Sequence, residues 1–204
     1  MSGCGDLISH RRDAEESGQP VTGQLRPPEE LSDVAIVVRR WRVDDAADLH
    51  RVISANVEHL RPWMPFIGAE PLVLGDRVAL LESWQVGWDE GREFPYAITE
   101  LDGRLLGSCG LHPRVGDEGL EIGYWLSSEA TGRGVATAAT GLLVAAAFSL
   151  DHVQFVEIRH DRDNEASGRV AERAGFARVG EEPRAPSAPG ESGTTVIWRL
   201  TRPD

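Results

Sequence analysis

Residues 119–136 read GLEIGYWLSSEATGRGVA, and this stretch decides the fold. An apolar run ends near Leu126, two glycines follow at positions 132 and 134, and an alanine-rich segment begins near Val135. A strand, a Gly-x-Gly turn and a helix in this order direct unpaired backbone N–H groups and the positive helix end toward one point. The pattern predicts a site for an anion, usually a phosphate, to which Arg133 adds a charge-assisted contact.

Two nucleotide-binding motifs share part of this pattern. A dinucleotide fingerprint needs a third glycine where this chain has Thr137, although Asp161 stands where a ribose-binding acid is expected. The sequence after Asp161 holds one short helix and a hairpin, too little for the second half of a doubly wound sheet. A P-loop is excluded because no Gly-Lys-Ser or Gly-Lys-Thr follows. The chain has 22 glycines, so the pair could also serve only the turn.

Composition indicates one globular domain preceded by a tail. A chain of 204 residues with 41% hydrophobic content can bury one ordinary core. Residues 1–32 are polar and rich in Gly, Pro and Ser, so we expect a flexible N-terminal tail there and a folded domain over 33–204. The tail holds no apolar segment long enough for a signal peptide or a membrane span.

Charge and cysteine content narrow the function classes. The formal net charge of −12 disfavours nucleic acid and anionic membranes as partners and favours cations such as protonated amines. Only Cys4 and Cys109 occur, so neither a disulfide framework nor a cysteine-based metal site is available. These features predict a cytoplasmic protein.

Hydrophobic spacing and turn residues predict an α+β fold. Asp102 and Gly103 indicate a tight hairpin, and a second turn is expected around Gly116. A long loop, PRAPSAPGESG at 183–193, either covers a site as a flap or is a surface loop without a role. The expected strands are 34–41, 94–100, 104–113, 120–126, 152–160, 176–182 and 194–200, and the expected helices are 44–60, 75–90, 132–150 and 166–176.

Three segments in order resemble the GNAT N-acetyltransferase family, in its RimJ/RimL-like branch. They are EHLRPWMPF at 58–66, EIGYWLSSEATGRGVATAA at 121–139 and NEASGRVAERAGF at 164–176. The resemblance covers 34–201. It implies the GNAT, or acyl-CoA N-acyltransferase, fold: a mixed, mostly antiparallel central sheet with a splayed parallel strand pair and about four helices.

The resemblance also implies the reaction and its cosubstrate. Acetyl-coenzyme A donates its acetyl group to a primary amine, a protein or peptide N-terminus or a small molecule, by direct attack in a ternary complex without a metal. Two alternatives stay open: another acyl donor such as succinyl-CoA, or a catalytically weak acyl-CoA-binding or sensing module. A homodimer is also left open.

Coenzyme-binding positions follow by matching the family pattern. The resemblance implies that main-chain N–H groups grip the pyrophosphate, at Gly132, Arg133, Gly134, Val135 and Ala136. It further implies that the pantetheine arm bonds the backbone of Trp125, Leu126 and Ser127 as an added strand would. The family usually begins the loop with Gln or Arg, where this chain has Thr131.

Glu121 is the leading candidate for the catalytic base. The resemblance implies that it points into the acceptor cleft, but an ordinary glutamate with a pKa of ~4.3 is a poor base for an ammonium unless its surroundings raise that value. The alternative is a strand-end glutamate that only forms a salt bridge. His112, at the end of the preceding strand, is a second candidate.

Asn164 and Ser167 lie three residues apart and share one face of a helix. The resemblance implies that Asn164 contacts the pantetheine arm and that Ser167 lies near the sulfur, where it can hydrogen-bond the departing thiolate. Both residue types also cap helices well, which is the alternative. Many family members place a tyrosine acid where this chain has Ala171, which leaves that role to Ser167 or water.

Arg61 and Trp63 lie in the segment RPWMPF, which in the family lines the acceptor pocket. An aromatic wall suits an acceptor chain, but the same tryptophan could pack only into the core. His160 and Asp161 end a predicted strand without metal-ligand spacing, so no metal site is predicted.

Overall fold

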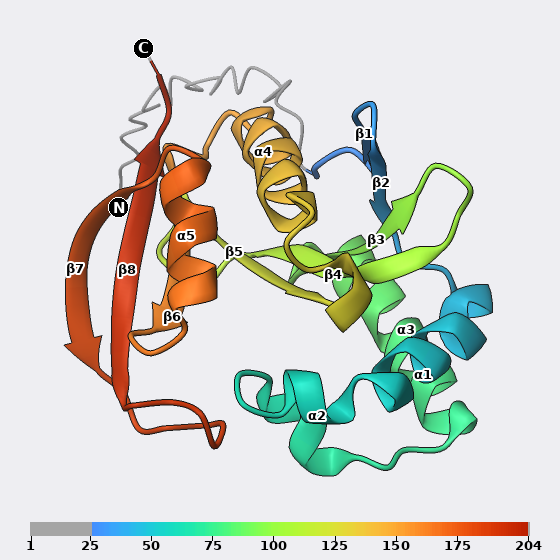
Figure 1. Cartoon of the computed structure of the whole chain (residues 1–204). Helices are drawn as coiled ribbons and strands as arrows, with labels where there is room; N and C mark the ends of the chain where they lie inside the picture. The colour runs from blue at the N-terminus through green and yellow to red at the C-terminus, as the bar shows by residue number, and fades with distance from the viewer. Residues whose placement is uncertain (1–25, 204) are drawn as a thin grey trace, which may run out of the picture.

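The computed structural model describes residues 26–203, which form an eight-stranded sheet flanked by helices on both faces (Figure 1). The strand order is β1-β2-β3-β4-β5-β6-β8-β7. The strands are β1 (Glu30–Ser32), β2 (Ile36–Arg40), β3 (Phe94–Glu100), β4 (Leu105–His112), β5 (Gly119–Leu126), β6 (Phe155–Asp161), β7 (Ala177–Pro183) and β8 (Thr194–Thr201). The α-helices are α1 (Ala46–Ala55), α2 (Val57–Leu60), α3 (Leu74–Asp89), α4 (Val135–Phe148) and α5 (Glu165–Arg173).

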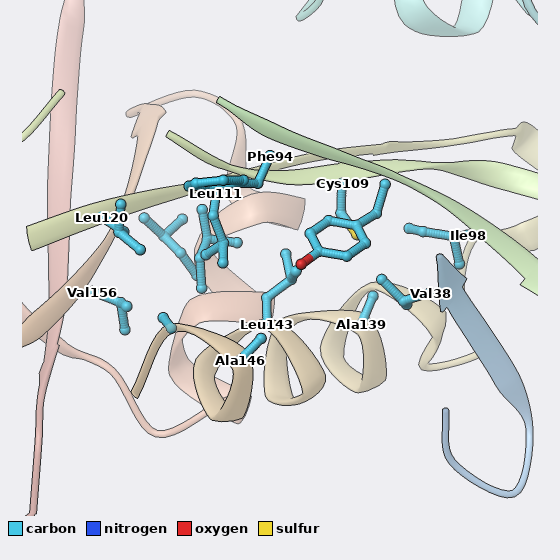
Figure 2. Close-up of a cluster of buried hydrophobic side chains, with 14 of the residues drawn as sticks. Val38, Phe94, Ile98, Cys109, Leu111, Leu120, Ala139, Leu143, Ala146 and Val156 are labelled. Atoms are coloured by element: carbon cyan, nitrogen blue, oxygen red, sulfur yellow. The ribbon is translucent and has the colours of Figure 1, made fainter. Parts of the chain in front are cut away.

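Two cores hold the helices to opposite faces of the sheet. Helices α4 and α5 cover one face, whereas α1, α2 and α3 cover the other (Figure 1). On the first face, Leu143 of α4 is fully buried beneath Leu111 and other sheet residues (Figure 2). On the second face, Leu49 and Leu81 from α1 and α3 pack with Ala97 of β3. Alternation along each strand therefore supplies apolar side chains to both layers.

The parallel pair of the sheet separates partway along its length. β5 pairs with β6 only from Gly119 to Glu121, opposite Phe155 to Glu157, although both strands continue beyond those residues. Every other pairing in the sheet is antiparallel. The predicted mixed, mostly antiparallel sheet with a splayed parallel pair is confirmed. The separation leaves one edge of the second half of β5 without a strand partner.

Gly119 permits the pairing at the start of this parallel pair. A Cβ atom at this position would lie 2.3 Å from the Phe155 ring, far inside van der Waals contact. The ring of Phe155 therefore packs directly over the backbone of Gly119. A larger residue at this position would displace the Phe155 ring from its place over the strand pair.

Regular structure begins before residue 33, which is the boundary expected from composition. Glu30–Ser32 form β1, which pairs antiparallel with β2 and covers its outer edge. The Tyr96 hydroxyl of β3 donates to the Pro28 carbonyl at 2.8 Å. The rest of the predicted tail, residues 1–25, lies outside the described residues.

The helix expected over 44–60 is divided in two, so residues 26–203 contain five α-helices. Asn56 interrupts it with non-helical backbone angles, φ −123° and ψ 15°. Its side-chain nitrogen donates to the Val52 carbonyl, and its oxygen accepts from both the N–H and the hydroxyl of Ser128, so the side chain takes over roles of the helix backbone. No helix within 26–203 has the length and apolar character to cross a membrane.

Candidate active site

A cavity of about 760 Å³ passes from the glycine-rich loop to the opposite face of the sheet, through the gap between β5 and β6. At one end it is lined by Gly132, Gly134 and the first turn of α4. At the other end it is lined by Glu121, Trp63 and residues of the loop between β7 and β8. One cavity therefore joins the predicted coenzyme site to the predicted acceptor site.

The glycine-rich loop has the backbone conformation that an anion site requires. Gly132 and Gly134 have φ of 73° and 80°, in the left-handed region that favours glycine. Gly134 is the N-cap of α4, and no side chain caps that end of the helix. The N–H groups of the first turn, from Val135 onward, are thus free of intrahelical partners and suit a pyrophosphate.

The Arg133 side chain does not face this site, contrary to the expectation of an added anion contact. Its guanidinium donates to Glu100 at 2.6 Å, at the end of β3. Glu100 also accepts from Arg104, and these two hydrogen bonds lower the pKa of Glu100. Only the expected main-chain contact of Arg133 is compatible with this side-chain position. The Thr131 hydroxyl donates to the Ser128 carbonyl at 2.7 Å and stabilises the turn before the loop.

The second half of β5 presents a free edge toward the gap. On its other edge, Tyr124, Trp125 and Leu126 pair with β4, and the Ser127 N–H donates to the Leu106 carbonyl at 2.8 Å. Because alternate backbone groups of a strand point to opposite edges, the remaining groups face the gap. This edge is where the pantetheine arm is expected from the sequence.

Asn164 and Ser167 meet at the start of α5, beside this edge. The Asn164 side-chain oxygen accepts from the Ser167 N–H at 3.1 Å, so Asn164 caps the helix, and the expected contact of Asn164 with the coenzyme stays a prediction. The cap uses only the oxygen and leaves the amide nitrogen of Asn164 as a donor. Ser167 Oγ lies 2.8 Å from the Tyr124 hydroxyl, a contact that was not expected from the sequence. Burial raises the pKa of Tyr124 to about 12, although its bond to Ser167 opposes the rise.

Glu121 lies in the cavity wall and is 8% exposed. Both of its oxygens accept from Arg114, with Nε to Oε2 at 2.9 Å and Nη2 to Oε1 at 2.5 Å. Glu121 therefore forms a salt bridge while its carboxylate still lines the cavity, and its role as the base stays a prediction. The hydrogen bonds and the negative charge of Glu121 raise the pKa of Arg114.

His112 lies directly opposite Glu121 in the β4–β5 ladder and lines the same cavity. Gly110 and Gly123, which also pair across these strands, form the floor beneath its ring: a Cβ atom at Gly110 would lie 3.1 Å from Nε2. Burial, followed by the charge of Arg114, lowers the pKa of His112 to about 4. The imidazole is therefore neutral at pH 7. Its Nδ1 lies 4.0 Å from Glu93 Oε2.

The acceptor end contains Trp63 but not Arg61. Trp63 lines the cavity together with Met64, Phe66 and Trp125, and the rings of Phe66 and Trp125 are 6.1 Å apart. Arg61 forms a surface ion pair with Glu58 at 3.2 Å and is not among the lining residues. The aromatic wall is present, whereas the predicted role of Arg61 has no geometric support.

Residues 184–193, here called the strap, close the acceptor end from the other side. The Gly190 N–H donates to the Pro62 carbonyl at 2.9 Å, so the strap touches the loop that carries Trp63. Figure 1 shows this loop, between β7 and β8, reaching toward α2. Arg184, Ser187 and Glu191 of the strap line the cavity. The strap therefore lies over the acceptor end of the cavity, where a flap would have to lie.

Asp161, at the end of β6, anchors the strap. Its carboxylate accepts from the Ser192 N–H at 2.9 Å, the Ser192 hydroxyl at 2.8 Å and the Gly193 N–H at 3.1 Å. Burial alone would raise the pKa of Asp161, but these bonds and one from the Asp163 N–H lower it to about 2.

His160 and Asp161 have structural partners. His160 Nε2 accepts from Trp198 at 2.9 Å, and Asp161 holds the strap. Within residues 26–203, no group of three or more His, Cys, Asp or Glu side chains is arranged to hold a metal ion.

Comparison with known proteins identifies the family. The family model described as "Acetyltransferase (GNAT) domain" matches residues 35–177 of this chain. The putative ribosomal N-acetyltransferase YdaF of Bacillus subtilis (strain 168) is 30% identical over 148 residues, which are 72% of this chain and 80% of that protein.

Two solved structures share the fold. RimL, a ribosomal L7/L12 alpha-N-protein acetyltransferase in complex with coenzyme A, superposes with a TM-score of 0.77 at 17% identity, covering 85% of this chain and 98% of that chain. Mycobacterium smegmatis RimJ, in complex with a coenzyme A disulfide, gives 0.70 at 24% identity, covering 86% and 84%. Since the family model covers residues 35–177 and the glycine loop and splayed strand pair border one cavity, the chain belongs to the GNAT family and is an acetyl-coenzyme A-dependent N-acetyltransferase.

Proposed function

We propose that the acceptor is the N-terminal amine of a protein or peptide. The observation that carries this proposal is the continuous cavity, whose acceptor end lies between the aromatic wall and the strap, on the sheet face opposite α4 and α5. A chain end can extend into such a passage and bring one amine to the gap between β5 and β6. The relative named as a putative ribosomal N-acetyltransferase supports the same class of acceptor.

Electrostatics favour the approach of this acceptor. The net charge of −12 draws protonated amines toward the protein. Near the acceptor end, Glu93 is a carboxylate without the bidentate arginine partner that Glu121 has, and its side chain is 32% exposed. It provides a negative charge at the cavity wall for the arriving ammonium, which must lose a proton before it can attack.

Coenzyme binding rests on main-chain groups. Acetyl-coenzyme A supplies the acetyl thioester, and in this proposal the N–H groups of the glycine loop and α4 hold its pyrophosphate. The free edge of Trp125 to Ser127 orients the pantetheine arm, with the amide nitrogen of Asn164 beside it. These contacts accelerate the reaction by holding the thioester and the amine in the orientation that the attack requires.

Glu121 is proposed as the base, acting through a water. Each carboxylate oxygen has a second lone pair after bonding Arg114, and can accept a hydrogen bond from a water that takes the amine proton. His112, neutral and directly across the ladder from Glu121, is the alternative proton acceptor. Ser167 is proposed to stabilise the thiolate that leaves.

Substitutions separate the two candidate bases. Glu121→Gln keeps the size and one acceptor oxygen, and we expect kcat to fall a hundredfold or more, on the order of a lost general catalyst, while acetyl-coenzyme A still binds. His112→Asn should then reduce kcat less than Glu121→Gln does. The reverse order of effects would assign the base to His112.

Thiol release from acetyl-coenzyme A tests the acceptor class. The panel comprises N-terminal peptides, aminoglycosides, polyamines and free amino acids, with mass spectrometry of each product. We expect turnover on peptides, with the acetyl group on the α-amine. Turnover only on small amines would overturn the proposal, and silence with coenzyme binding retained would favour another acyl donor or a binding module.

A further inference from the structure

Tyr124 and Ser167 come from different elements and meet at the wall of the cavity. Tyr124 is in the middle of β5, in the half of the strand that has separated from β6, and Ser167 is in the first turn of α5. Their hydroxyl oxygens are 2.8 Å apart, and both residues line the cavity. The contact spans 43 positions in sequence and joins the two elements that border the gap.

Proton positions in this pair have two arrangements. The Tyr124 hydroxyl lies 2.8 Å from Ser167 Oγ and 3.2 Å from the Ser167 carbonyl, and it has one proton to donate. If the serine donates to the phenol oxygen, its own proton is used within the pair. If the phenol donates to Oγ, the serine proton is free to point elsewhere. The phenol stays protonated at neutral pH because burial raises its pKa to about 12.

The remaining groups of Ser167 are already satisfied. Its N–H donates to the Asn164 side chain at 3.1 Å, so the start of α5 needs no bond from the hydroxyl of Ser167. The Asn164 cap also fixes the first turn of the helix and thereby the place of the serine Cβ. Tyr124 is left as the group that fixes the Oγ rotamer.

We propose that Tyr124 is a positioning residue whose phenol donates to Ser167 Oγ and directs the serine proton toward the departing coenzyme A thiolate. This inference rests on the proposed role of Ser167. As the amine nitrogen forms its bond to the acetyl carbon, the carbon–sulfur bond breaks, its electron pair goes to sulfur, and the amine proton goes to the base. The thiolate accepts a hydrogen bond from Ser167 and later takes its proton from water, so neither hydroxyl loses a proton.

A double-mutant cycle in the full chain tests the proposal by turnover. Ser167→Ala should lower kcat about tenfold or more, the scale of a hydrogen bond to a charged group. Tyr124→Phe, which keeps the ring, should lower kcat about tenfold with the acetyl-coenzyme A KM unchanged. The double variant should be no slower than Ser167→Ala, because the phenol acts only through the serine.

Coenzyme A binding gives a second readout that needs no turnover. The thiol of coenzyme A is ionised to a far greater extent at pH 9.5 than at pH 7, so a positioned serine should make coenzyme A bind more tightly at the higher pH. The reference ligand is the desulfo analogue, which carries hydrogen in place of the thiol. By calorimetry, we expect both Tyr124→Phe and Ser167→Ala to remove the gain at pH 9.5 that coenzyme A shows over the desulfo analogue.

Tyr96→Phe is the matched control. This tyrosine is in the same sheet and its hydroxyl donates to the Pro28 carbonyl at 2.8 Å, but it does not line the cavity. Its substitution removes a comparable hydrogen bond, so thermal unfolding of the two phenylalanine variants can be compared directly. We expect Tyr96→Phe to retain kcat and the pH-dependent gain in coenzyme A binding.

The outcomes separate the inference from the function on which it rests. If Ser167→Ala retains full turnover, the serine role itself is wrong. If Ser167→Ala is slow but Tyr124→Phe is as fast as Tyr96→Phe, or if the two effects multiply in the double variant, the positioning role of Tyr124 is wrong. If the wild-type chain acetylates no amine, the proposed function fails before either test.

Discussion

Gly190→Ala should weaken acceptor binding by separating the strap from the loop that carries Trp63. A Cβ atom at Gly190 would lie 2.7 Å from the Pro62 carbonyl oxygen, where ordinary contact begins at 3.4 Å, so the two must separate by about 0.7 Å. Gly190 has no left-handed φ, so the effect is a steric one against backbone. The shift lengthens the 2.9 Å bond between them beyond hydrogen-bonding distance.

Losing this bond costs about 1 kcal/mol, or roughly fivefold in the population of the closed strap. We therefore expect the acceptor KM to rise about three- to tenfold, with the acetyl-coenzyme A KM unchanged. The assay is thiol release with each substrate varied in turn. Gly180→Ala in the same hairpin is the control, because a Cβ atom there meets nothing within 4 Å. An unchanged acceptor KM, or an equal rise for both substrates, would refute the reasoning.

Two further predictions concern residues that tie segments together. The pKa of Asp161 is lowered from 3.8 to about 2. The contribution of this carboxylate to stability is therefore complete above pH ~4 and is lost as the pH falls toward 2. Asp161→Asn should remove this part of the acid dependence, as measured by urea unfolding at pH 5 and pH 3. Asn56→Ala should lower the free energy of unfolding by about 1–3 kcal/mol because it leaves the Ser128 N–H unpaired, and a chemical-denaturation curve that matches wild type would contradict this.

Local sequence patterns were sufficient for most of the fold. Asp102 and Gly103 do connect β3 to β4, and the stripe of apolar residues over 75–90 is α3. These features depend on residues close together in the chain, where turn chemistry and periodicity act directly. The glycine loop could also be predicted, because the left-handed conformation at Gly132 and Gly134 favours glycine.

What the sequence did not predict depends on contacts between distant segments. β1 is three residues long and exists because β2 offers an edge, which no local pattern in ELS reveals. The helix break at Asn56 is stabilised by Ser128, 72 positions away. Tyr124 had one usable signal, since a tyrosine hydroxyl in a buried strand needs a partner, but Ser167 as that partner follows only from the packing of α5.

The charged side chains were the least predictable part of the site. Arg133 stands between two loop glycines, yet its guanidinium pairs with Glu100 of β3. Arg114 follows β4 directly and bonds Glu121 through the hairpin register, so the leading base is also half of an ion pair. A long arginine side chain can reach several carboxylates, and the tertiary structure determines which of them it pairs with.

The gap between β5 and β6 couples the lifetime of the protein to its metabolic surroundings. A ligand that occupies this gap binds the native chain and not the unfolded one, so it stabilises the fold by mass action. At a concentration one hundred times its dissociation constant, the coenzyme adds about 2.7 kcal/mol, a large fraction of the stability of an ordinary domain. If acetyl-coenzyme A binds in this gap, depletion of its pool should shift the chain toward unfolded forms, which are degraded sooner.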